Sequence, residues 1–221
     1  MRIALFDLDN TLLAGDSDVE WPRFLISKGI LDAESTAREN DRFFEHYKAG
    51  TLDIQAFLAF QLSPLGRFKR AELDELHREY MRQHIVPLIT DKARALVKQH
   101  QEAGDLVLII TATNRFVTGP IAREFGIEHL IATEPEIIDG EYTGKPTGIP
   151  CFQGGKITRL EHWLQERSEK LADFEESWFY SDSRNDLPLL EQVSHPVAVD
   201  PDDTLRAHAE AHGWPVISLS N

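Results

Sequence analysis

Two aspartates, one residue apart, follow the first hydrophobic run of the chain. The run covers residues 3–6, and Asp7 and Asp9 come directly after it. A short apolar run of this kind predicts a buried strand of a parallel sheet, and open α/β sheets bind their ligands at the carboxyl ends of such strands. An isolated aspartate here would be explained as a turn former or a helix cap. Two carboxylates, together with three further segments, favour a reactive site instead.

A second apolar and β-branched run, residues 106–110, is followed by Thr111, Ala112 and Thr113 and then by a helical pattern. Hydroxyl groups and free backbone N–H groups at the start of a helix form a natural anion site. This segment could therefore hold a phosphate group. Threonines also cap many helices that bind nothing, so the segment alone does not indicate a site.

Lys156 follows two glycines at the start of an amphipathic helical pattern. The positive end of the helix dipole disfavours a lysine there, and a surface lysine is normally only hydrated. The position is explained if carboxylates of the site lie beside it. A lysine in that place could neutralise a phosphoryl oxygen.

Asp182 and Asp186 come after the hydrophobic residues 178–180 and flank a turn. With Asp7 and Asp9 they make four carboxylates at the ends of two predicted strands. So much like charge in one cleft requires a cation. Hard oxygen ligands are those that Mg²⁺ prefers, so the sequence predicts a Mg²⁺ site.

Taken in order, these segments resemble the haloacid dehalogenase-like hydrolase superfamily. The resemblance rests on Asp-x-Asp-x-Thr beginning at Asp7, a strand that ends at Thr111, Lys156, and Ser-Asp-x-x-Asn-Asp ending at Asp186. These four motifs lie between residues 7 and 186 and so cover most of the chain. The resemblance implies an α/β fold with a doubly wound, Rossmann-like parallel sheet and an inserted helical cap.

The resemblance also implies a role for each motif residue. Asp7 is expected to attack phosphorus and form an aspartyl-phosphate, and Asp9 to act as general acid and base. An aspartate at this second position marks phosphatases and phosphotransferases rather than dehalogenases. Thr111, Ala112 and Lys156 are expected to bind the phosphate group.

The metal and its surroundings follow from the same resemblance. Asp182 is expected to bind Mg²⁺ together with Asp7 and the main-chain carbonyl of Asp9. Asp186 is expected to act through Lys156 or through a metal-bound water.

Composition excludes several other classes of function. Lysine and arginine total 23 against 37 aspartates and glutamates, so the formal net charge of −14 repels a nucleic-acid backbone. The single cysteine, Cys151, allows no intrachain disulfide and no multi-cysteine zinc cluster, which fits a reducing compartment. No signal peptide or membrane-spanning run is recognisable. We therefore expect a cytoplasmic protein that acts on a small phosphorylated metabolite, with no nucleic-acid or membrane partner.

The segment between the first two motifs differs from the rest of the chain. Residues 17–86 contain no convincing strand. They show helical periodicity in the stretches 21–28, 35–48, 54–62 and 70–83. We therefore expect residues 17–86 to form a helical cap inserted after the first motif, and residues 1–16 and 87–221 to form the α/β core.

The rest of the chain alternates helical patterns with short apolar runs, a rhythm that predicts a parallel sheet with helices on both faces. After residue 91 these runs lie near residues 106–110, 130–132, 178–180, 197–199 and 216–217. The dipeptide Asp139-Gly140 suits a type I′ turn and predicts a hairpin over residues 137–142.

An insertion at this point resembles the cap of the subclass, called IB, that contains phosphoserine phosphatase. Such a cap closes over the site, excludes water from the phosphoaspartate and supplies residues that recognise the substrate. The alternative is a helical subdomain without a role in specificity.

Asp16 is the residue nearest to the acid with which phosphoserine phosphatases hold the substrate ammonium. Helix capping by Ser17 or Asp18 is the alternative explanation of this acidic run. Those enzymes also carry a cap arginine for the substrate carboxylate, in a stretch resembling residues 52–59, where this chain has no arginine. The departure favours a cationic or neutral substrate without a carboxylate. Histidinol phosphate fits, and the Gly-Asp-Ser-Asp sequence resembles a phosphatase branch linked to it.

Aromatic side chains of residues 17–86 could stack on the imidazole of such a substrate, although packing also explains them. They are Trp21, Phe43, Phe44 and Phe57.

The sequence therefore predicts a Mg²⁺-dependent phosphatase that hydrolyses a small metabolite through an aspartyl-phosphate. Phosphoserine phosphatase and a phosphotransferase with the same intermediate are the enzymatic alternatives. A catalytically silent metabolite-binding protein is the non-enzymatic alternative, and the intact pair of Asp7 and Asp9 argues against it. A response-regulator receiver would lack the large insertion. The sequence indicates no oligomeric state.

Overall fold

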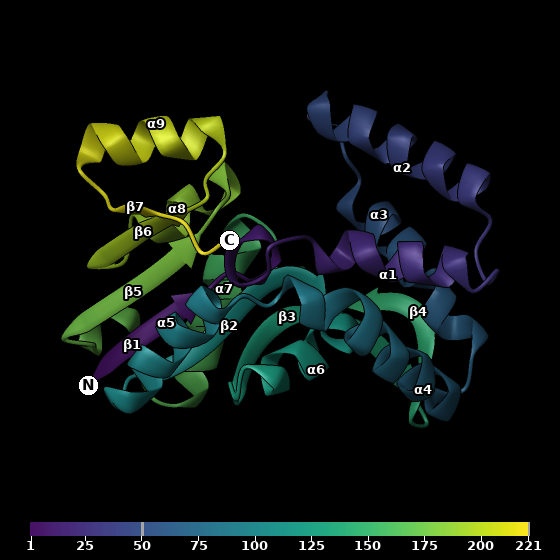
Figure 1. Ribbon diagram of the computed structural model, residues 1–221, viewed down its shortest axis with the longest axis horizontal. Helices are drawn as coiled ribbons and strands as arrows, with labels where there is room; N and C mark the ends of the chain where they lie inside the picture. Colours follow the sequence, from purple (N-terminus) through teal and green to yellow (C-terminus); the bar gives the residue numbers. More distant parts are fainter. Residues whose placement is uncertain (50, 221) are drawn as a thin grey trace.

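The computed structural model describes residues 1–49 and 51–220, except for the side chains of Tyr47 and Lys48. Within these residues, seven strands form one sheet in the order β4-β3-β2-β1-β5-β6-β7 (Figure 1). From β3 to β7 in this order, each strand pairs in parallel with its neighbour. Strands β3 and β4 form an antiparallel hairpin. The strands are β1 Arg2–Phe6, β2 Leu106–Asn114, β3 His129–Ile138, β4 Glu141–Thr147, β5 Glu176–Ser181, β6 His195–Val199 and β7 Val216–Ile217. The predicted α/β fold with a doubly wound sheet is confirmed.

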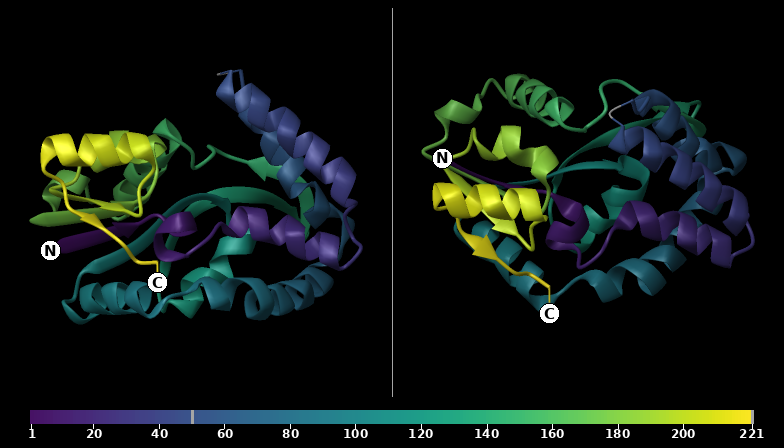
Figure 2. Two further views of the ribbon diagram at one scale, coloured as in Figure 1. Left: turned by 45° about the horizontal axis from the view of Figure 1, so that its top comes forward. Right: turned by 90° about the horizontal axis from the view of Figure 1, so that it is seen from above.

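Helices cover both faces of the sheet (Figure 2). They are α5 Asp91–Glu102, α6 Arg115–Glu124, α7 Gly154–Glu166, α8 Leu187–Leu190 and α9 Asp203–His212. Side chains alternate along β1, so Ala4 and Phe6 pack with α5 and α6, whereas Ile3 and Leu5 pack with α7, α8 and α9. Both faces of β1 are therefore buried, as a central parallel strand requires. Of the helices described, none combines the length and the apolar character needed to cross a bilayer.

Besides α5, the described residues between β1 and β2 form four further α-helices. They are α1 Ser17–Ser27, α2 Ala33–Lys48, α3 Ile54–Leu62 and α4 Arg70–Tyr80. The expected stretch 54–62 coincides with α3, whereas α4 ends before the expected residue 83, at a wider turn over Met81–Ile85. That these helices act as a lid stays a prediction.

Helix α1 begins at Ser17, earlier than the expected residue 21, because Asp16 caps it. One carboxylate oxygen of Asp16 accepts hydrogen bonds from the backbone N–H groups of Asp18 and Val19, at 2.9 and 3.1 Å. The expectation that Ser17 or Asp18 caps this helix was wrong.

The β3–β4 hairpin extends beyond the sheet and supports the helices between β1 and β2. Its turn has φ of 53° at Asp139 and 82° at Gly140, so the predicted type I′ geometry is confirmed. A Cβ atom on Gly66, in the turn after α3, would lie 2.6 Å from the carbonyl oxygen of Thr143 in β4. The two backbones therefore pack directly against each other. The expected strand at 130–132 is longer, because β3 continues into the hairpin with β4.

The two connections between the core and these helices run side by side. Leu13 and Ile89 form an isolated antiparallel bridge, and the backbone N–H of Ala14 donates to the carbonyl of Leu88 at 2.8 Å. The chain thus leaves the core and returns to it at one place.

His77 of α4 joins these helices to the core. Its Nε2–H donates to the carbonyl oxygen of Val117 in α6 at 2.9 Å, and its ring packs against Trp21 of α1 and Phe116 of α6. Burial lowers the pKa of His77 to about 4 because the charged imidazolium would lose its hydration. The ring is therefore neutral in the folded protein at neutral pH.

Replacing His77 by glutamine, whose amide can still donate to the Val117 carbonyl, should flatten the acid dependence of stability. The unfolded chain binds a proton below the ordinary pKa of 6.5, whereas folded His77 resists protonation down to about 4. The free energy of unfolding of the native chain therefore falls as pH is lowered through this window, by on the order of 3 kcal/mol from this group. Urea denaturation of both proteins across this window measures the difference. Parallel pH profiles would contradict the role given to His77.

Gly155 allows α7 to begin close to the preceding loop. A Cβ atom on Gly155 would overlap the carbonyl oxygen of Pro150, whereas a Cβ atom on Gly154 would meet nothing within 4 Å. The obstacle at 155 is backbone, which a side-chain rotation cannot relieve. The two neighbouring glycines therefore differ in what they tolerate.

Gly155→Ala should lower the melting temperature by at least about 5 °C, because the start of α7 must move. Gly154→Ala is the matched control, and we expect it to be neutral or slightly stabilising, since alanine favours helix. Differential scanning calorimetry of the three proteins measures both effects. Equal melting temperatures for the two variants would show that the close approach is absent.

Candidate active site

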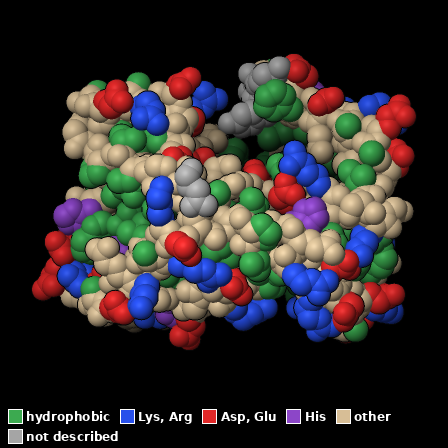
Figure 3. Space-filling model, in the orientation of Figure 1, with side chains coloured by type: hydrophobic (Ala, Val, Ile, Leu, Met, Phe, Trp, Pro, Cys, Tyr) green, Lys and Arg blue, Asp and Glu red, His purple; other side chains and the backbone are tan. Residues whose placement is uncertain are grey.

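The predicted site residues meet at the carboxyl edge of the sheet. Strands β2 and β5 both pair in parallel with β1, so the residues that end these three strands lie side by side. A cavity of about 230 Å³ opens there, and it is lined by Asp7, Asp9, Asp16, Thr111, Ala112, Lys156, Asp182 and Asp186. Figure 3 shows a hollow on this side of the molecule, between the lobe that carries α8 and α9 and the lobe that carries α2 and α3. Every residue that the sequence placed at the site is present, and their catalytic roles stay predictions.

Lys156 lies between two carboxylates. Its Nζ donates to Oδ1 of Asp7 and to Oδ2 of Asp186, both at 2.8 Å. Ser181, the last residue of β5, donates its hydroxyl to the same oxygen of Asp186 at 2.7 Å. The lysine is 5% exposed, so it is held by these partners rather than by water. They account for a lysine in the first turn of α7, where the helix dipole disfavours it.

The carboxylates carry more negative charge than this lysine compensates. Burial raises the pKa of Asp7 to about 7, with Lys156 acting to lower it. Burial and the nearby charge of Asp7 raise the pKa of Asp182 to about 8. Burial also opposes the charge of Lys156, but Asp186 and Asp7 outweigh that effect and hold its pKa above the usual value. A further cation is needed to keep both Asp7 and Asp182 ionised at neutral pH.

Mg²⁺ fits this set of donors. The carboxylates of Asp7 and Asp182 and the main-chain carbonyl of Asp9 are hard oxygen ligands, and Mg²⁺ usually keeps waters or substrate oxygens in its other positions. Within the part of the chain that the structure describes, no three His, Cys, Asp or Glu side chains converge to form a complete cage. The expected set contains only two side chains, so it would not form such a group, and the metal site stays a prediction.

Asp182 is oriented by Thr11, which the sequence analysis did not assign to the site. The Thr11 hydroxyl donates to Oδ1 of Asp182 at 3.1 Å and accepts from the backbone N–H of Asp182 at the same distance. Thr11 is the threonine of the Asp-x-Asp-x-Thr motif, so the motif already indicated that this residue belongs to the site.

Asp9 is held by a different set of residues from Asp7. Its Oδ1 accepts from the backbone N–H and the hydroxyl of Ser17, at 2.6 and 2.5 Å, and its Oδ2 accepts from the Thr113 hydroxyl at 2.7 Å. Burial, with the charge of Asp16, raises the pKa of Asp9 to about 6, while Ser17 and Thr113 act to lower it. The hydroxyl of Tyr80 donates to the carbonyl of Ser17 at 2.8 Å and supports this contact. The sequence had no signal for the roles of Ser17 and Tyr80.

Thr111 lies inside β2 rather than at the start of a helix. The strand continues to Asn114, whose side chain caps α6 by accepting from the N–H of Val117. Thr111 is buried, and its hydroxyl accepts from the N–H of Thr113 at 3.2 Å. Thr111 and Ala112 still line the cavity, but they do so from a strand end.

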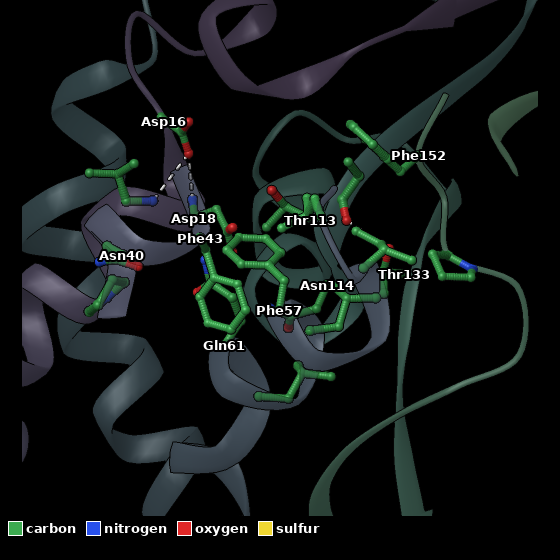
Figure 4. A pocket seen from close by; sticks show the side chains of 18 of the residues that line it. Asp16, Asp18, Asn40, Phe43, Phe57, Gln61, Thr113, Asn114, Thr133 and Phe152 are labelled. Atoms are coloured by element: carbon green, nitrogen blue, oxygen red, sulfur yellow. Dashed lines mark hydrogen bonds between the residues drawn. The ribbon is translucent and has the colours of Figure 1, made fainter. Parts of the chain in front are cut away.

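A second cavity, of about 480 Å³, adjoins the first and is shown in Figure 4. Asp16 and Asp18 line both cavities. Burial raises the pKa of Asp18 well above its usual value, and the charges of Asp16 and Asp9 add to the effect. Asp18 is therefore a half-buried acid beside the site, and the sequence had explained it only as a helix cap.

Comparisons with known proteins agree with this geometry. A family model described as haloacid dehalogenase-like hydrolase matches residues 4–191. A protein of Neisseria meningitidis named histidinol-phosphatase is 50% identical to this chain over 219 residues, which are 99% of each chain. A crystal structure of a protein of unknown function from Bordetella pertussis Tohama I superimposes with a TM-score of 0.94 at 48% identity, over 99% of both chains.

A phosphoserine phosphatase, solved as a phospho-aspartyl intermediate analogue, superimposes with a TM-score of 0.66 over 99% of this chain and 93% of its own. At 18% identity this likeness shows the fold alone. The family model and the half-identical relative go further and confirm the resemblance seen in the four motifs. On these grounds the chain belongs to the haloacid dehalogenase-like hydrolase family.

Proposed function

We propose that this protein is a Mg²⁺-dependent phosphatase that hydrolyses histidinol phosphate through an aspartyl-phosphate on Asp7. The coarser part of the prediction, a phosphatase of this family acting on a small phosphorylated substrate, is confirmed by the relatives. The observation that supports this chemistry is that Asp7 and Asp9 have different hydrogen-bond partners. Lys156 contacts Asp7, whereas Asp9 is bound separately by Ser17 and Thr113.

In the first step, a carboxylate oxygen of Asp7 attacks the phosphorus atom and the bond from phosphorus to the ester oxygen breaks. Asp9 gives its proton to the leaving alkoxide, which departs as an alcohol. The ammonium of Lys156 lies 2.8 Å from Asp7 and stabilises the negative charge on the transferring group. Thr111 and Ala112 line the same cavity, which supports their expected role in binding the oxygens of the phosphoryl group.

In the second step, Asp9 takes a proton from a water molecule, and the resulting hydroxide attacks phosphorus. The bond between phosphorus and the Asp7 oxygen breaks, which releases phosphate and restores the carboxylate. The chemistry that Mg²⁺ supplies when bound by Asp7, Asp182 and the Asp9 carbonyl is neutralisation of the phosphoryl charge. Asp186 holds Lys156 in place throughout.

The lining of the second cavity, which receives the leaving group, supports histidinol phosphate as the substrate. Phe43, Phe57 and Phe152 line it, and Asp16 and Asp18 are the charged residues among its described lining. Aromatic rings and acids suit a leaving group with a flat ring and a positive charge. A carboxylate, as in phosphoserine, would meet acids and no described cation in that cavity. Histidinol phosphate has the ring and the ammonium without the carboxylate.

Asp7→Asn should abolish turnover, because an amide cannot form the acyl phosphate. Asp9→Asn should lower kcat for an alkyl ester by about 10²- to 10⁴-fold but still form phosphoenzyme from an aryl ester, whose leaving group needs no proton. Acid quench followed by intact-protein mass spectrometry detects the phosphoenzyme. Near-normal turnover by Asp7→Asn, in protein purified free of host phosphatases, would contradict the covalent mechanism.

The native protein with Mg²⁺ should hydrolyse histidinol phosphate with a kcat/KM at least about tenfold above that for phosphoserine. Excess chelator should abolish both activities, and added Mg²⁺ should restore them. Phosphate release measured for both esters tests the two expectations separately. Equal or faster hydrolysis of phosphoserine would contradict the substrate, and full activity in chelator would contradict the metal.

A further inference from the structure

The second cavity has two chemically distinct walls. In Figure 4, Asp18, Phe43 and Phe57 lie on the side formed by the helices between β1 and β2, and Thr113, Thr133 and Phe152 lie on the core side. The rings of Phe43 and Phe57 meet edge to face, with centroids 5.3 Å apart. One wall therefore combines apolar rings with a carboxylate, whereas the other is mostly polar.

The two acids of this cavity differ in what they already bind. Asp16 caps α1, and the same oxygen accepts from two backbone N–H groups. Asp18 is half-buried, and its carboxylate accepts no hydrogen bond and forms no ion pair within the described part of the chain. A half-buried carboxylate without a partner is costly unless a ligand supplies one. Asp18 is therefore the acid that is available to a ligand.

We propose that Asp18 determines specificity by pairing with the cationic group of the leaving alcohol, whose flat ring lies against Phe43 and Phe57. This inference rests on the proposed function and deepens it, since it names the residue that selects a leaving group with a positive charge. It gives Asp16 a different task from the one that the sequence suggested. Asp16 fixes the start of α1, and α1 in turn presents Asp18 to the cavity.

The position of Asp18 explains how charge selection is coupled to the reacting centre. Ser17, its chain neighbour, binds Asp9 through both its backbone N–H and its hydroxyl. A cation held by Asp18 is thus one residue away from the contact that orients the general acid. No described lysine or arginine lines this cavity, so Asp18 has no competing positive partner there.

Three phosphate esters distinguish recognition of the positive charge of the leaving group from recognition of its ring. Histidinol phosphate carries a ring and an ammonium, phosphoethanolamine carries the ammonium alone, and phenethyl phosphate carries a neutral ring. The measurement is kcat/KM for each ester with the native protein and with four variants, Asp18→Asn, Asp18→Glu, Asp16→Asn and Glu20→Gln. Glu20 is the matched control, because it lies on α1 but pairs with Arg23 and His84 away from the cavity.

Asp18→Asn should reduce kcat/KM for the two cationic esters at least about tenfold more than for phenethyl phosphate. Asp18→Glu should recover part of this discrimination because it restores the charge. Asp16→Asn should change the discrimination much less, since asparagine caps a helix as well as aspartate does. Glu20→Gln should leave the ranking of the esters unchanged.

Binding of histidinol, the expected product, supplies a readout that does not depend on turnover. Titration calorimetry should show weaker binding to Asp18→Asn and unchanged binding to Glu20→Gln. Melting temperatures close to that of the native protein establish that each variant is folded.

A uniform loss for all three esters in Asp18→Asn would overturn the inference, and so would a larger selective loss in Asp16→Asn. If Asp18→Asn fails to fold, Asp18→Glu decides, because loss of all discrimination with the charge retained contradicts a simple ion pair. A native protein that prefers phosphoserine would instead contradict the proposed substrate. Failure of the inference and failure of the proposed function are therefore distinguishable.

Discussion

A buried lysine between two carboxylates is the interaction on which the rest of the site depends. An unpaired ammonium in the interior costs several kcal/mol, so Lys156 must keep its contacts with Asp7 and Asp186. These contacts tie the end of β1, the first turn of α7 and the turn before α8 to one another. The position of α7 is therefore set by charge as well as by packing, and Gly155 lets the helix begin where the charge requires it.

The two acids of the first motif are close in sequence but are held by different parts of the molecule. Asp7 contacts α7 of the core, whereas Asp9 contacts Ser17 of α1 and Thr113 of β2. The chain turns sharply just after Asp9, with Asn10 at a φ of 57°. One acid is thus positioned by the core alone, and the other depends also on the segment between β1 and β2. In the proposed mechanism, this separation gives the nucleophile and the proton carrier distinct surroundings although they are only two residues apart.

The sequence predicted what depends on local pattern. Apolar runs that end in acids located β1 and β5, and their parallel pairing then required Asp7 and Asp182 to meet. It did not predict contacts between segments far apart in the chain, such as Tyr80 with Ser17, because no local periodicity records them. The cap of α1 was assigned to Ser17 or Asp18 rather than to Asp16 for a related reason. Several adjacent polar residues can cap a helix, and only the path of the chain into α1 selects among them.

The bridge between Leu13 and Ile89 bears on how such a protein diversifies. Because the chain leaves and re-enters the core at adjoining backbone positions, segments of different length can join these two positions without changing the order of the strands. A new helical segment can replace the old one without any change in strand order or in the lysine and its carboxylates. The lysine and its two carboxylates would then be inherited together with the sheet, whereas any new segment would have to supply again the contacts that Ser17 makes with Asp9.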